Sequence, residues 1–185
     1  WQKQIILNKL KRKGIIKSAY RGIYYKPGRC VFGETGLDYT RLIKLKYLKD
    51  REGNIKGYIT GAKLFNWIGF ITLVPNVMEI VTNECKYYKK YDDKLRTYII
   101  KPKMQITNEN HQYLQFLDIL ENKDNIHIEV EKENKILYNI IRECNLNFEK
   151  LIKYAKETNN KKALVKLLIL KKWKLFIKTI DFEIK

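Results

Sequence analysis

The segment GYITGAKLFNWIGFITLVPNVMEIVTNE, at residues 57–84, constrains the fold more than any other part of the chain. Gly57, Gly61 and Gly69 divide it into a short strand, a two-turn helix and an extended passage, because glycine accepts backbone turns that other residues avoid. Pro75 then fixes a bend before a second strand. The segment therefore predicts a mixed α/β unit whose turns are set by a few residues.

Short polar side chains recur through the same segment. Its threonines and asparagines can satisfy backbone groups that the turns leave without partners, which is a scaffold role. The alternative is a functional surface that is built from the same loops. The candidate residues of that surface, which would be exposed, are Thr60, Lys63, Asn66 and Asn83.

The front of the chain predicts a helix that is followed at once by a hairpin. Apolar residues recur at helical spacing through residues 1–14, and Gly14 suits the helix end. Strand-forming residues at 15–28 follow and are interrupted at Gly22. This order is typical of the back half of a winged helix-turn-helix.

The middle of the chain predicts a further helix with Asp38 as its N-cap, the strand–helix–strand segment, and a hairpin that turns at Asp92–Asp93. From there the pattern becomes helical, and Thr107 or Asn108 would cap the first of these helices. In the last helix, one buried face would consist of Ala163, Leu164, Leu167, Leu168 and Trp173.

The charge of the chain indicates the kind of partner. There are 38 Lys and Arg against 20 Asp and Glu, a net charge of +18, which is typical of a protein that binds nucleic acid or another anionic partner. The first acidic residue is Glu34, so residues 1–33 carry only cations. The candidates for binding DNA phosphates are Lys9, Lys11, Arg12, Lys13, Lys17, Arg21 and Lys26. Codon bias and a merely solvated lysine face are the alternatives.

No pattern in the sequence is typical of catalysis, so we expect no catalytic residues, no metal site and no cofactor. His111 and His127 have no Cys, His or Asp at metal-ligand spacing. Metal-dependent nucleases use Glu-x-Lys pairs, and four such pairs occur here. This number is expected by chance in a lysine-rich chain, so the pairs do not indicate a nuclease. The three cysteines lie far apart, which indicates a reducing cytoplasm, and no apolar run is long enough to span a membrane.

The glycine-containing segment, taken together with LKRKGIIKSAYRGIYYKP, resembles the AbiE-type antitoxin family, including its uncharacterised close relatives. The shared motifs are Gly-Ile-Ile, Arg-Gly-Ile-Tyr-Tyr, Gly-Tyr-Ile-Thr-Gly, Leu-Phe-Asn, Val-Pro-Asn, Glu-Ile-Val-Thr-Asn and a later LQFLDIL. In this chain they lie at Gly14–Ile16, Arg21–Tyr25, Gly57–Gly61, Leu64–Asn66, Val74–Asn76, Glu79–Asn83 and Leu114–Leu120. The resemblance covers roughly residues 5–121.

The resemblance implies an N-terminal winged helix that binds inverted repeats in its own promoter, which is double-stranded DNA, and represses the operon. It also implies an α/β antitoxin domain that counters a nucleotidyltransferase-like toxin in phage defence, without requiring a stable complex between the two proteins. A complete winged helix needs further helices before its last one, and the chain begins at Trp1 without methionine. We therefore expect either residues upstream of Trp1 or a reduced domain.

Together these observations predict an α+β protein with a partial winged helix-turn-helix at 1–33, an α/β antitoxin-like domain at 34–121 and a helical C-terminal region at 122–185. The predicted function is that of a cytoplasmic, non-enzymatic antitoxin and DNA-binding transcriptional autoregulator without a membrane partner. The alternatives are a nucleic-acid-processing enzyme or accessory in phage defence, and a protein-interaction module that binds a toxin.

Overall fold

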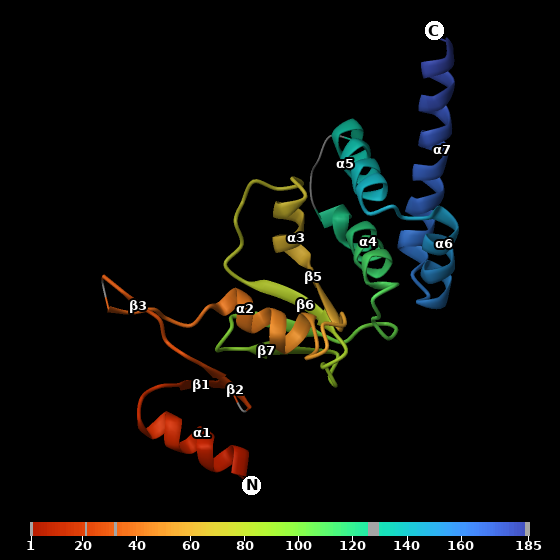
Figure 1. Ribbon diagram of the computed structural model, residues 1–185. Helices are drawn as coiled ribbons and strands as arrows, with labels where there is room; N and C mark the ends of the chain where they lie inside the picture. Colours follow the sequence, from red (N-terminus) through yellow and green to blue (C-terminus); the bar gives the residue numbers. More distant parts are fainter. Residues whose placement is uncertain (1, 21, 32, 126–129, 184–185) are drawn as a thin grey trace. The chain divides into compact units, whose positions relative to one another are not determined.

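The computed structural model describes residues 2–20, 22–31, 33–125 and 130–183 (Figure 1). The chain divides into two compact units, Trp1–Lys44 and Leu45–Lys185, and each is described by itself. Helices and small sheets make up the fold, so the predicted α+β class is confirmed. The winged helix-turn-helix and the predicted domain limits at residues 33 and 121 stay predictions.

The first unit starts with helix α1, Gln2–Arg12, which ends where Ile15 N donates a hydrogen bond to Leu10 O at 3.1 Å. Within α1, which the structure describes completely, no side chain is buried. Ile5 and Ile6 are 54% and 58% exposed. The predicted helix is therefore confirmed, but its apolar residues do not form a buried face.

A hairpin follows α1, as predicted. Strands β1 (Lys17–Tyr20) and β2 (Ile23–Tyr25) pair antiparallel. A second small hairpin, which the sequence pattern does not predict, joins β3 (Arg29–Cys30) to β4 (Gly33–Glu34).

Helix α2 (Tyr39–Ile43) begins at the predicted N-cap residue. The Asp38 Oδ1 atom accepts a hydrogen bond from Arg41 N at 3.0 Å, which satisfies an amide of the first helical turn. The chain then continues as a π-helical turn at Lys44–Leu48.

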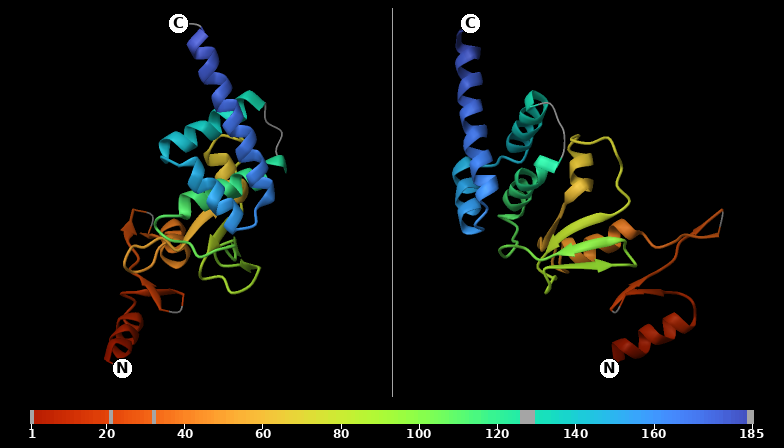
Figure 2. Two further views of the ribbon diagram at one scale, coloured as in Figure 1. Left: turned by 90° about the vertical axis from the view of Figure 1, so that its right-hand side faces the viewer. Right: turned by 180° about the vertical axis from the view of Figure 1, so that it is seen from behind.

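The second unit is built on a mixed sheet with the strand order β5-β6-β8-β7 (Figure 2). Its strands are β5 (Gly57–Thr60), β6 (Met78–Thr82), β7 (Lys89–Asp92) and β8 (Thr97–Ile100). β6 pairs antiparallel with β5 and parallel with β8, while β7 and β8 form the predicted hairpin. Helix α3 (Gly61–Trp67) connects β5 to β6, which confirms the predicted strand–helix–strand order.

Gly57 lies where two backbone segments approach each other closely. A Cβ atom at this position would lie 2.8 Å from Val81 O and closer still to Tyr47 O. Beside it, the fully buried Thr82 donates its hydroxyl hydrogen bond to the same Tyr47 O at 2.8 Å. The first glycine of the segment therefore permits close packing of the sheet.

Helix α4 (His111–Asn122), the 3₁₀ turn Lys123–Asn125, α5 (Val130–Glu143), α6 (Phe148–Glu157) and α7 (Lys161–Glu183) complete the second unit. Helix α4 lies between β5 and the pair α6 and α7, as Figure 1 shows. The main core contains Phe116 and Leu120 of α4, Leu151 of α6 and Leu167 of α7. Among the described residues, no helix is long and apolar enough to cross a membrane.

The predicted cap of α4 is wrong. Asn110 is the N-cap residue, in place of Thr107 or Asn108, and its side chain does not bond to the first helical turn. Instead Asn110 Oδ1 accepts a hydrogen bond from Thr107 N at 2.8 Å, and Thr107 Oγ1 accepts one from Asn110 N at 3.3 Å. This reciprocal pair closes the loop before the helix.

The predicted buried face of α7 is partly wrong. Ala163, Leu167 and Leu170 are buried at i, i+4 and i+7 spacing, whereas Leu168 is 50% exposed. The buried stripe is narrower than the sequence predicts, because Leu170 occupies the core in place of Leu168. The side chain of Trp173 lies outside the described part of the chain.

Candidate functional site

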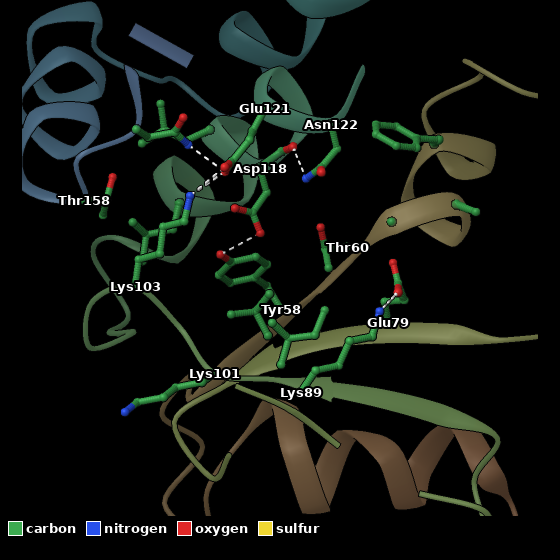
Figure 3. A pocket seen from close by; sticks show the side chains of 18 of the residues that line it. Tyr58, Thr60, Glu79, Lys89, Lys101, Lys103, Asp118, Glu121, Asn122 and Thr158 are labelled. Carbon is green, nitrogen blue, oxygen red and sulfur yellow. Dashed lines mark hydrogen bonds and ion pairs between the residues drawn. The ribbon is translucent and has the colours of Figure 1, made fainter. Parts of the chain in front are cut away.

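A pocket of about 820 Å³ opens in the second unit between the sheet, the start of α3 and helix α4 (Figure 3). We call it the α4 pocket. Apolar side chains, including Phe65, Leu114 and Leu117, form much of its wall. The charged residues that line it are the carboxylates Glu79, Asp118 and Glu121 and the lysines Lys89, Lys101 and Lys103.

Strand alternation and helix periodicity bring these side chains together. Tyr58 and Thr60 are two residues apart on β5, so both point to one face of the sheet. Val81 and Glu79 of β6 are their register partners and share that face. Helix α4 contributes one row of side chains to the pocket, because residues at i, i+3, i+4 and i+7 lie on one face of a helix. These residues are Leu114, Leu117, Asp118 and Glu121.

Asp118 is the most perturbed acid of the pocket. Burial raises the pKa of its carboxyl to about 6, while hydrogen bonds from Tyr58 and Thr60 act in the opposite direction. The Tyr58 hydroxyl donates to Asp118 Oδ2 at 3.0 Å. Burial, and next the Asp118 charge, raises the pKa of Tyr58 well above its usual value, so Tyr58 remains a donor.

The other two carboxylates of the pocket have cationic partners. Glu79 pairs with Lys89 at 2.7 Å, and Glu121 pairs with Lys103 at 2.6 Å. Glu121 Oε2 also accepts a hydrogen bond from Asn160 Nδ2 at 2.9 Å. Figure 3 shows Lys101 directed away from all three carboxylates. Of the three carboxylates, Asp118 is therefore the one that bonds to no lysine among the described residues.

Gly61 gives the Glu79 side chain its space. A Cβ atom there would collide with Glu79 Oε2, and the backbone φ of +68° lies in the left-handed region that favours glycine. The conformation of the β5–α3 turn thus places the Glu79 carboxylate at the pocket.

We expect Asp118→Asn to change how stability depends on pH. The pKa of about 6 exceeds the usual 3.8, so the folded protein holds this proton more tightly than the unfolded chain does. The Asp118 contribution to stability is therefore present below pH about 4 and is lost as the pH rises through about 6. A neutral amide avoids this loss, which amounts to roughly 2–3 kcal/mol.

Urea titrations of both proteins at several pH values between these limits measure the effect. The free energy of unfolding of Asp118→Asn should exceed that of the wild type increasingly as the pH rises. Other acids, Glu34, Asp50 and Asp124, have lowered pKa values, so their contributions to stability change with pH in the opposite direction. These contributions are the same in both proteins and cancel in the difference. A difference that does not vary with pH would contradict the expectation.

The predicted DNA-binding residues lie in the first unit. Lys9, Lys11 and Arg12 are exposed on α1, and Lys13 and Lys26 are exposed beside the helix and hairpin. Lys17 differs, because its ammonium pairs with the Glu34 carboxylate, and both side chains are 50% exposed. This contact raises the pKa of Lys17 and lowers that of Glu34. Arg21 lies outside the described residues.

The four candidates for an antitoxin surface have different environments. Thr60 lines the α4 pocket and is buried, so the expectation that it is exposed is wrong. Lys63 Nζ lies 6.0 Å from the centroid of a Trp67 ring. Asn66 Nδ2 donates to Leu73 O at 3.0 Å. These contacts favour the scaffold role for part of the segment.

Asn83 supports the same interpretation. Its amide donates to Ile106 O at 2.9 Å and accepts from Ile106 N at 2.9 Å. Asn83 thus joins the end of β6 to the loop before α4 by a two-bond bridge.

The sequence patterns did not predict the α4 pocket. One signal was available: Asp118 and Glu121 continue the apolar stripe of Leu114 and Leu117, where two further apolar residues would be expected of a purely structural helix. Acids on the inward face of a helix indicate a polar cavity. The contribution of Tyr58, 60 positions earlier, had no comparable signal.

No protein-family model matches the sequence, and no curated protein matches it. Among the described residues, no group of three or more His, Cys, Asp or Glu side chains is placed to hold a metal ion. The arrangement can instead bind a ligand, with apolar walls, the Asp118 acceptor and lysine donors.

Proposed function

We propose that the chain is a DNA-binding regulator whose first unit contacts the phosphates of a duplex. The observation that carries this proposal is the charge of α1 and the hairpin after it. Helix α1 contains four cations, Lys3, Lys9, Lys11 and Arg12, and no acid. Residues 1–33 contain no Asp or Glu, so no carboxylate within that stretch repels a DNA phosphate.

The dimensions of these elements suit a duplex. An α-helix with its side chains is about 10–12 Å across, and the major groove of B-DNA is about 12 Å wide. The exposed cations at the end of α1 would contact phosphates along the groove, with a hairpin beside the backbone as in winged helices. Release of counterions from the DNA then supplies sequence-independent affinity.

The regulatory context of the proposal comes from the resemblance to AbiE-type antitoxins. On that basis the duplex is the chain's own promoter, and the protein counteracts a nucleotidyltransferase-like toxin without requiring a stable complex with it. The second unit, which contains five of the seven shared motifs, would carry the antitoxin activity. Co-expression with the product of the neighbouring gene tests this activity separately from DNA binding.

The test of DNA binding is charge reversal in the full chain. Lys11→Glu with Arg12→Glu should weaken binding to the promoter duplex at least tenfold, because each lost phosphate contact removes a released counterion. The slope of log affinity against log salt should become shallower by about 2. Fluorescence anisotropy over a series of salt concentrations measures both quantities.

The matched control reverses two lysines elsewhere. Lys150 and Lys156 are exposed on α6, and changing both to Glu alters the net charge by the same amount. This control should retain the wild-type salt slope. If both double variants weaken binding equally, the bulk charge of the chain is responsible, and the proposal for α1 is wrong.

A further inference from the structure

The α4 pocket adjoins a part of the sheet that carries exposed tyrosines. Tyr91 of β7 is the register partner of Tyr98 of β8, and their ring centroids lie 4.8 Å apart. Tyr98 is also the register partner of Glu79 on β6, so these rings share the sheet face that borders the pocket. Their exposed fractions are 38% and 36%.

A third tyrosine and three lysines line the pocket itself. Tyr88 lines the pocket and is 87% exposed. Lys89 Nζ lies 4.3 Å from the centroid of the Tyr98 ring, and Lys101 and Lys103 also line the pocket. Aromatic rings interleaved with lysines on an open sheet are the groups on which bases stack and to which phosphates bind.

We propose that the α4 pocket and the adjoining Tyr88, Tyr91 and Tyr98 bind single-stranded nucleic acid. One base would enter the pocket, and its neighbours would stack on the tyrosines. The pocket volume of about 820 Å³ lies within the range of small-ligand sites. The apolar walls suit the flat faces of a base, and the polar groups suit its edge.

The charges around the α4 pocket are compatible with phosphates at its rim. Glu79 and Glu121 are each neutralised by a bonded lysine. Lys101 is exposed and directed away from the carboxylates, so it is available to a phosphate outside the pocket. The chain as a whole carries a net charge of +18, which favours a polyanionic partner over a cationic one.

Asp118 determines which bases suit the pocket. A carboxylate accepts hydrogen bonds from exocyclic amino groups such as that of cytosine. The two oxygens of Asp118 have acceptor capacity beyond the bonds from Tyr58 and Thr60. Uracil and thymine lack an exocyclic amino group. We therefore expect cytosine to bind more tightly than either of them.

This preference should depend on pH. The ionised carboxylate is the better acceptor, so the preference should decrease as the pH falls through about 6. The charged or titratable groups that act on Asp118 are Tyr58 on β5, Glu121 on α4 and Lys103 in the loop before it.

All residues of this single-strand site lie in the second unit, so the site does not depend on the duplex contacts proposed for the first unit. The experiment uses the full chain and labelled oligonucleotides of about 12 nucleotides, which is a typical single-strand site size. Cytosine and thymine oligonucleotides are made as DNA, and cytosine and uracil oligonucleotides as RNA. Anisotropy titrations at about 150 mM salt limit unspecific contacts.

Tyr88→Ala should weaken binding of the cytosine oligonucleotides about tenfold, because a stacked base is lost. Tyr91→Leu should weaken it similarly while keeping an apolar group against Tyr98. Tyr39→Ala is the matched control, since Tyr39 is a 57% exposed tyrosine of the first unit. It should bind as the wild type does. Whichever of RNA and DNA binds more tightly identifies the natural ligand.

Asp118→Asn should remove the preference for cytosine and its pH dependence while leaving the stacking contribution of Tyr88. The inference is overturned if Tyr88→Ala and Tyr91→Leu both bind like the wild type. It is also overturned if Lys11→Glu with Arg12→Glu abolishes single-strand binding, because the first unit would then be responsible for it.

Discussion

Gly57→Ala is expected to lower the free energy of unfolding of the second unit by about 3 kcal/mol. The added methyl group would lie 2.8 Å from Val81 O, 2.9 Å from Thr82 Cβ and closer still to Tyr47 O. Two of these neighbours are backbone atoms, and Tyr47 O also accepts the hydrogen bond of the Thr82 hydroxyl. Relief of the overlap therefore requires the sheet to shift. Urea titration followed by circular dichroism measures the change.

Gly36→Ala is the control for this prediction. A Cβ atom at Gly36 would have no neighbour within 4 Å, and the residue is not in the left-handed region. We expect a change of less than about 0.5 kcal/mol, as for an ordinary surface substitution. Equal effects at the two glycines would show that close packing is not the reason for glycine at position 57.

Leu167→Ala is expected to cost the second unit about 3 kcal/mol. Leu167 has no exposed surface and lies in the core with Leu120 and Leu151. Removing its isobutyl group loses the transfer free energy of the buried carbons and leaves a cavity between α4, α6 and α7. The midpoint of urea unfolding should fall accordingly.

Leu168→Ala separates this packing effect from helix propensity. Leu168 is the next residue on α7, loses the same atoms on substitution, and is 50% exposed. Its replacement should change the free energy of unfolding by less than about 0.5 kcal/mol. If Leu168→Ala proves as costly as Leu167→Ala, the narrow buried stripe described for α7 is wrong.

Local patterns were sufficient to predict most elements of the fold. The glycines at 57, 61 and 69 separate β5, α3 and the passage to β6 because turn geometry depends on neighbouring residues. The N-cap at Asp38 and the hairpin of β7 and β8 are equally local. The parallel pairing of β6 with β8 was not predicted. Strand β7 lies between them along the chain, so their pairing depends on how the whole sheet assembles.

The two candidate sites also differ in how far the sequence predicts them. The cations of the first unit could be identified from the sequence because they cluster within residues 1–33, which contain no Asp or Glu. The α4 pocket joins Tyr58, Glu79 and Asp118, which lie far apart along the chain, so its composition follows only from the sheet register and the position of α4. Likewise, the contact of Lys17 with Glu34 depends on the second hairpin, which the sequence did not predict.

Strand β7 forms one edge of the order β5-β6-β8-β7, so its outer backbone groups have no sheet neighbour among the described strands. Such an edge can template amyloid-like growth by adding a strand from another molecule. Two consecutive lysines, Lys89 and Lys90, begin this strand, and stacking identical copies would bring like charges together. The same lysine-rich composition that favours an anionic partner therefore also opposes aggregation along this edge.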